Sequence, residues 1–143
     1  MTSTIRKRPG SMPRIAWFLG REYVTRLYDR YIRRQSREHA VLEYVVRHAT
    51  RGSPGSVLQT MDTFARERRW LQNVGPSKGA VLLQALRDAQ ARRVLEIGSY
   101  CGYSATLIGN YLAAHGGQLT AIELSRRNAE VARQVVAHAG LAS

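Results

Sequence analysis

Apolar side chains recur at helical spacing through the first two thirds of the chain. Residues 14–34 place them three or four apart with arginines on the other faces, which predicts a basic amphipathic helix. Residues 38–49 predict a second helix, which the Gly- and Pro-containing stretch 51–55 breaks. Ser56 suits the N-cap of a third helix, and Pro76 suits the first turn of a fourth. The face that this last helix is expected to bury comprises Val81, Leu82, Ala85, Leu86 and Ala89.

The pattern changes in the last third of the chain. Residues 93–98 form a short apolar run that ends in glycine, which is typical of a buried strand. Residues 103–114 return to helical spacing, and residues 118–123 predict a second strand that ends in a carboxylate. Ser125 then suits the N-cap of a last helix. This βαβα order predicts the α/β fold class, with two parallel strands joined by a right-handed crossover.

Length and composition agree with one ordinary globular domain. The chain has 143 residues, of which 44% are hydrophobic and 22% charged, so it can build a core. The single cysteine, Cys101, excludes an intramolecular disulfide scaffold. No apolar run approaches the ~20 residues that span a bilayer, and no segment resembles a signal peptide. A soluble, cytoplasmic protein is therefore expected.

The positive charge gathers at the N-terminus. Residues 1–37 hold ten basic and two acidic side chains, which account for two thirds of the net charge of +12. Residues 1–37 are therefore expected to form an arginine-rich N-terminal extension that contains a basic amphipathic helix. The basic helix over residues 14–37 suits a membrane surface or nucleic acid, but it equally suits docking on its own domain with a solvated arginine face.

Candidate chemistry lies around the turn after the first predicted strand. Gly98 and Gly102 remove side chains where the turn bends and where a ligand approaches. Glu123 ends the next strand beside the same crevice, where a carboxylate binds ribose hydroxyls. The Gly-x-x-x-Gly spacing differs from that of dinucleotide binders, and Glu96 suits an ammonium or sulfonium better than a phosphate. S-adenosylmethionine carries a ribose, an ammonium and a sulfonium together, so it fits this pattern. The alternative is an ordinary α/β crossover that binds no ligand.

Four segments resemble the catechol O-methyltransferase family over residues 38–141. These segments are SVLQTMDTFARERRWLQNVGPSKG, VLEIGSYCGYSA, LTAIEL and AHAGL. The resemblance implies a Rossmann-like fold of the class I S-adenosylmethionine-dependent O-methyltransferases. It also implies methyl transfer to a phenolic hydroxyl of a small catechol-like substrate.

The resemblance assigns one group of residues to the methionine end of the cofactor. The backbone of Val74 would meet the carboxylate, and Ser104 would hydrogen-bond the same group. Glu96 and Gly98 would face the ammonium, and Tyr100 would line the cofactor.

A second group is assigned to the nucleoside and the acceptor. Glu123 would bind the ribose hydroxyls, and Leu124 would lie against the adenine. Trp70 would wall the aromatic substrate pocket, or would serve only as a core anchor. Gln72 stands where a larger apolar residue is usual, which would alter the surroundings of the methyl-donor sulfur.

The resemblance implies that residues 38–143 are the N-terminal, cofactor-binding half of a methyltransferase domain, whose C-terminal half residues 1–143 do not contain. In the family, the chain continues after this second strand and its helix, and it supplies the Mg²⁺ ligands, the lysine base and most of the sheet. No catalytic or metal-binding residue is therefore expected here. A two-stranded parallel sheet would leave Val94, Leu95, Ile97 and Ile122 poorly buried. The isolated chain is expected to be only marginally stable, or to need a second chain or an oligomer that completes the sheet. The alternative is a truncated, non-catalytic protein whose basic helix binds a membrane surface or nucleic acid.

Overall fold

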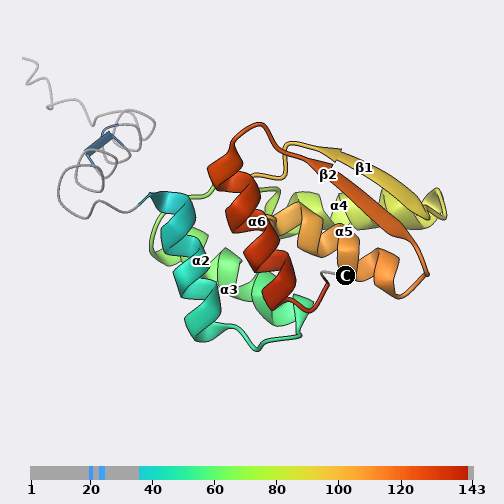
Figure 1. Cartoon of the computed structure of the whole chain (residues 1–143), viewed down its shortest axis with the longest axis horizontal. Coiled ribbons are helices and arrows are strands. Elements are labelled where there is room, and N and C mark those ends of the chain that lie inside the picture. Colours follow the sequence, from blue (N-terminus) through green and yellow to red (C-terminus); the bar gives the residue numbers. More distant parts are fainter. Residues whose placement is uncertain (1–19, 21–22, 25–35, 142–143) are drawn as a thin grey trace, which may run out of the picture. The chain divides into compact units, whose positions relative to one another are not determined.

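The computed structural model describes Gly20, Tyr23, Val24 and residues 36–141. The predictions for the leader and the basic helix over residues 14–37 therefore fall almost wholly outside the described residues. From Arg37 onward the chain forms one compact unit of five helices and two strands (Figure 1). No helix among the described residues is long and apolar enough to cross a bilayer. The elements are α2 (Arg37–His48), α3 (Pro54–Glu67), α4 (Gly75–Asp88), β1 (Arg93–Ile97), α5 (Tyr103–Ala113), β2 (Gln118–Ile122) and α6 (Arg126–His138).

Side-chain caps set the starts of α3 and α6. Ser125 caps α6 as predicted, because its side chain accepts a hydrogen bond from the backbone N–H of Asn128 at 3.3 Å. The prediction of Ser56 as the cap of α3 is wrong. Ser53 is the cap, accepting from the N–H of Ser56 at 3.3 Å, and Pro54 opens the helix. Proline has no N–H to lose in the first turn, so the helix begins one residue after Ser53.

The face that α4 buries differs from the predicted one. Leu86 is buried as expected, but Val81 is 71% exposed. Ala85 and Ala89 are exposed as well. Gly79 is buried instead, because its backbone packs against the side chain of Leu107 on α5. Both sides of α4 carry apolar residues, and the contact with α5 selects one of them.

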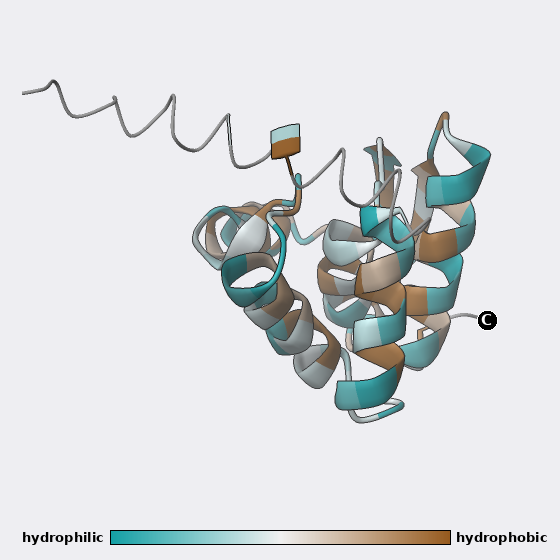
Figure 2. Cartoon of the chain, turned by 90° about the vertical axis from the view of Figure 1, so that its left-hand side faces the viewer, coloured by the Kyte–Doolittle hydropathy of each residue, from teal (hydrophilic) through white to brown (hydrophobic). Residues whose placement is uncertain are grey.

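The core has two parts. In the larger part α2, α3 and α6 pack together around Val41, Val45, Met61 and Val135, and the loop residue Cys101 is buried with them. These helices show alternating apolar and polar stripes, as amphipathic helices do (Figure 2). The smaller part lies between α4, α5 and the strands, and comprises Leu86, Ile108, Tyr111 and Leu112.

The sheet has two parallel strands, β1 and β2, and α5 packs beneath it (Figure 1). The βαβα unit predicted from the pattern is therefore confirmed. Full burial of β1 is not observed: Val94 is half-buried, but Leu95 is exposed and Ile97 is 80% exposed. Ile122 of β2 is also exposed, directly opposite Ile97 in the register. The expected poor burial is confirmed for these three side chains, because no element of the described chain covers that face.

Candidate functional site

The turn between β1 and α5 has an unusual backbone. Gly98, Tyr100 and Gly102 have φ values of +87°, +47° and +82°. At Gly102 a Cβ would lie 3.0 Å from Cα of Ala132 on α6, so both the conformation and the space require glycine. At Gly98 the space is open, and its backbone conformation alone requires glycine. The sequence thus identified both glycines, although close packing explains only the second.

Glu123 ties this turn to the end of β2. Its Oε2 accepts a hydrogen bond from the N–H of Tyr100, and its Oε1 accepts one from the N–H of Ser125, both at 2.9 Å. The N–H of Gly98 donates to the carbonyl of Ile122 at 2.7 Å beside it. A single carboxylate therefore connects the turn after β1 with the start of α6.

The side chain of Tyr100 reaches α2. Its hydroxyl donates to Oε1 of Glu38 at 3.0 Å, and burial together with nearby negative charge raises the Tyr100 pKa. Burial, and next the charge of Glu38, raise the pKa of the Cys101 thiol to about 12. This thiol therefore stays protonated near neutral pH and is not a nucleophile. Glu38 was not predicted as a site residue, because nothing local links it to a residue 62 positions away.

A pocket of about 240 Å³ lies beside the turn. It brings together four of the predicted residues, Val74, Gly98, Tyr100 and Ser104. It also contains residues that were not predicted to line a cofactor pocket, although they lie within two of the segments that resemble the catechol O-methyltransferase family. These are Asn73, Lys78, Ser99, Cys101 and Tyr103, together with Gln72, which was noted only for its departure from the family.

Two buried polar atoms at this place have no hydrogen-bond partner among the described residues: Oε2 of Glu96 and Nδ2 of Asn73. Asn73 lines the pocket, and Glu96 lies beside it, close enough to the pocket residue Ser104 for that side chain to influence its pKa. Burial raises the Glu96 pKa, the nearby Ser104 side chain lowers it, and the negative charge of Glu123 raises it further. The pocket thus contains an unused donor, on Asn73, and an unused acceptor lies beside it, on Glu96; Lys78 of the lining adds a positive charge. This combination suits a ligand that carries both an ammonium and a carboxylate.

Trp70 and Leu124 lie apart from this pocket. Trp70 is 43% exposed, with the Arg37 guanidinium 5.8 Å from its ring centroid, so it is not a core anchor. Leu124 is 99% exposed, immediately after β2 and next to Glu123. Neither side chain is among those that line the pocket.

No group of three or more His, Cys, Asp or Glu side chains in the described part of the chain could hold a metal ion. The magnesium that the resemblance associates with the complete family domain therefore finds no ligand set among these residues.

Glu96 gives the site a predicted pH dependence. A raised pKa means that the ionised carboxylate costs folding free energy at neutral pH, and that this cost disappears below the unfolded value near 4.5. We therefore expect Glu96→Gln to raise the urea midpoint at about pH 7, and the difference to vanish at about pH 3.5. Glu130→Gln is the matched control. Hydrogen bonds from Gln134 and Arg133 lower the Glu130 pKa, so Glu130→Gln should lower the urea midpoint at about pH 7. Equal urea midpoints for Glu96→Gln and the unaltered chain at neutral pH would contradict the raised pKa of Glu96 in the folded state.

The parts of the site together define a class of protein. A parallel βαβα unit, a glycine turn opening α5 and a carboxylate at the end of β2 form the first half of a Rossmann-like methyltransferase fold. A family model described as O-methyltransferase matches residues 48–143. The chain belongs to this O-methyltransferase family.

Named relatives agree with this family. The chain is 42% identical over 108 residues to catechol O-methyltransferase B of Danio rerio, and the match covers 76% of this chain and 40% of the relative. It is 35% identical over 127 residues to catechol O-methyltransferase of Mus musculus, covering 89% and 46%. A probable O-methyltransferase of Mycobacterium tuberculosis is 43% identical over 105 residues, covering 73% and 44%. The chain thus spans less than half the length of these relatives.

Proposed function

We propose that the chain binds S-adenosylmethionine at the pocket beside the β1–α5 turn. In this proposal it provides the donor side of an O-methyltransferase that acts on a phenolic hydroxyl of a catechol-like small molecule. Membership of the O-methyltransferase family supports the use of this cofactor. The names of the zebrafish and mouse relatives support the class of acceptor.

The observation that carries the proposal is the pair of unused polar atoms at the pocket. Buried polar groups in proteins are nearly always hydrogen-bonded, so a buried acceptor and a buried donor at one site favour a ligand that satisfies both. In the proposal Oε2 of Glu96 accepts from the ammonium of the methionine moiety. Nδ2 of Asn73 and the ammonium of Lys78 face its carboxylate.

Glu123 serves the nucleoside in this proposal. A carboxylate has about four acceptor positions, and two of them already hold backbone N–H groups. The remaining positions suit the two hydroxyls of a ribose, which both donate. Leu124, fully exposed beside Glu123, supplies an apolar surface for the adenine.

The cofactor, when bound, supplies a methyl group on a positively charged sulfur. The residues of this chain bind it, orient it and neutralise its charge, and orientation of donor and acceptor is itself a large part of catalysis. Glu96 and Glu123 add negative charge on the side where the ligand is positive. The proposal assigns no base and no acceptor contact to the described residues, apart from Trp70 as one wall of the acceptor pocket.

Calorimetric titration of the full chain with S-adenosylmethionine tests the proposal. We expect saturable binding of one ligand per chain, nearly unchanged between about 50 and 200 mM salt, because the proposed contacts act over hydrogen-bond distances, well within the screening length. Titration with ATP is the control, since a chain of net charge +12 attracts polyanions and this attraction falls steeply with salt. A folded chain that binds neither ligand would overturn the proposal. So would binding of both ligands with the same steep loss in salt.

A further inference from the structure

The first turn of α5 forms one wall of the 240 Å³ pocket. Tyr103 and Ser104, the first two residues of the helix, both line this pocket. No side chain caps α5, and the turn that leads into it holds Tyr100 at a positive φ. A non-glycine residue in this conformation costs free energy and persists only where surrounding contacts hold it. The position of the wall therefore depends on contacts from other elements.

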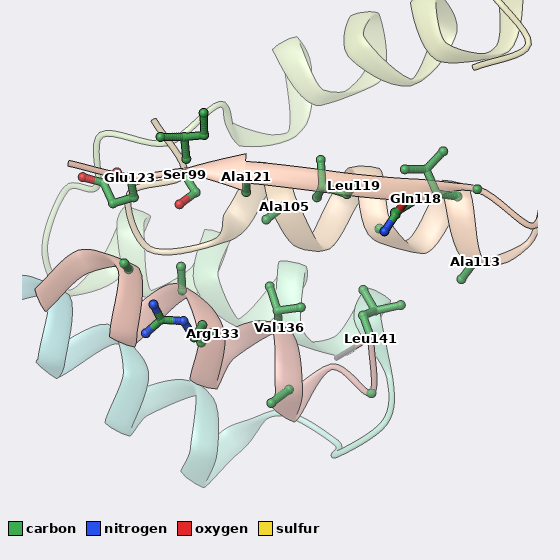
Figure 3. A pocket seen from close by; sticks show the side chains of 18 residues that line it. Ser99, Ala105, Ala113, Gln118, Leu119, Ala121, Glu123, Arg133, Val136 and Leu141 are labelled. Atoms are coloured by element: carbon green, nitrogen blue, oxygen red, sulfur yellow. The ribbon is translucent and has the colours of Figure 1, made fainter. Parts of the chain in front are cut away.

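One such contact comes from the end of β2. The carboxylate of Glu123 accepts the N–H of Tyr100 at 2.9 Å. Figure 3 shows the Glu123 side chain beside Ser99 of the same turn, where both also line a larger cavity of about 950 Å³ between β2, α5 and α6. This contact holds the turn three residues before α5 begins.

A second contact comes from α3 and reaches the first residue of α5. The hydroxyl of Tyr103 donates to Oδ2 of Asp62 at 3.1 Å, across 41 positions of the chain. Burial, and next the charge of Asp62, raise the Tyr103 pKa, so the hydroxyl keeps its proton and remains the donor. Tyr103 is only 4% exposed. Loss of the Asp62 acceptor would leave a buried donor without the partner that it has here, which is costly enough to displace the ring.

We propose that Asp62 is a positioning residue for the cofactor site, an inference that rests on the proposed function. Asp62 does not line the pocket itself. It acts through Tyr103, whose ring it fixes together with the first turn of α5 before a ligand arrives. A site that is ordered in advance binds more tightly, because less conformational freedom is lost on binding.

Calorimetric titration with S-adenosylmethionine tests the role of Asp62. We expect Asp62→Ala and Tyr103→Phe each to weaken binding at least ~10-fold, and the double variant to bind no more weakly than either, because both changes remove the same hydrogen bond. Asp62→Asn keeps an oxygen acceptor and should stay within ~3-fold of the unaltered chain. Additive losses in the double variant would show that the two side chains act independently, which overturns the proposal.

Tyr111→Phe is the matched control for Tyr103→Phe. Tyr111 lies on the same helix, and its buried hydroxyl donates to the carbonyl of Leu86 at 3.0 Å, but it does not line the pocket. Its replacement should lower the urea midpoint and leave the affinity for S-adenosylmethionine unchanged. The same pattern in Asp62→Ala, a lower urea midpoint with unchanged affinity of the folded chain, would make the role of Asp62 purely structural and overturn the proposal.

Hydrogen exchange tests the positioning without any ligand. The amide of Thr106 donates to the carbonyl of Gly102 and so reports on the first turn of α5. In Asp62→Ala it should exchange at least ~10-fold faster than in the unaltered chain, while amides in the last turn of α5 keep their rates. Unchanged exchange of Thr106 would overturn the inference whether or not the chain binds S-adenosylmethionine. Failure of the unaltered chain to bind would instead overturn the proposed function, and with it the service of Asp62 to the cofactor.

Discussion

Replacing Glu123 with alanine is expected to weaken S-adenosylmethionine binding at least ~100-fold. The carboxylate accepts the N–H groups of Tyr100 and Ser125, and in the proposed complex it also accepts the ribose hydroxyls. Hydrogen bonds to a charged group contribute about 1.5–3 kcal/mol each, and every 1.4 kcal/mol is about a tenfold change in affinity. Loss of the two ribose contacts alone therefore accounts for about 100-fold, which calorimetry measures directly.

Two further variants test whether the loss of binding is specific to the Glu123 carboxylate. Glu123→Gln keeps one oxygen acceptor and should lie between the unaltered chain and alanine, at about a tenfold loss. Glu130→Ala removes an exposed carboxylate on α6 and should not change binding. Circular dichroism checks that Glu123→Ala is folded. A folded alanine variant that binds with unchanged affinity would remove Glu123 from the site.

Replacing Gly102 with alanine is expected to destabilise the fold by about 2–4 kcal/mol. The residue has φ of +82°, which costs a non-glycine residue about 1–3 kcal/mol. The new Cβ would also lie 3.0 Å from both Cα and O of Ala132, and backbone atoms of a packed helix cannot easily give way. The variant should therefore loosen the contact between the β1–α5 turn and α6. Urea unfolding of both proteins measures the difference.

Gly55→Ala is the matched control for Gly102→Ala. Gly55 lies in the first turn of α3, where an added Cβ meets nothing within 4 Å and φ is not positive. Alanine there should leave stability unchanged or raise it by up to ~1 kcal/mol. Equal unfolding midpoints for Gly102→Ala and the unaltered chain would contradict the strain at Gly102.

The order and type of the elements could be predicted because they depend on neighbours along the chain. The change from helical spacing to short apolar runs near residue 93 locates β1, α5 and β2. Ser125 identifies the start of α6, since a cap acts within one turn. Ser56 was the wrong cap of α3 because two serines compete there, and Pro54 favours Ser53. The motif residues Gly98, Tyr100 and Ser104 lie on one local turn and its helix, so their joint position at the pocket also follows from the sequence.

Contacts between distant segments were decided only by the tertiary structure. The choice of Gly79 over Val81 on α4 depends on where α5 lies, because both faces of that helix are apolar. Glu38 meets Tyr100 across 62 residues, and the sequence does not show that Asn73 lines the pocket with a donor that has no partner among the described residues. The sequence by itself therefore determined the elements, the glycine turn and the carboxylate at the end of β2. Packing in three dimensions decided which side chains surround the pocket, since the hydrophobic effect is non-directional and does not specify which distant segment an apolar side chain contacts.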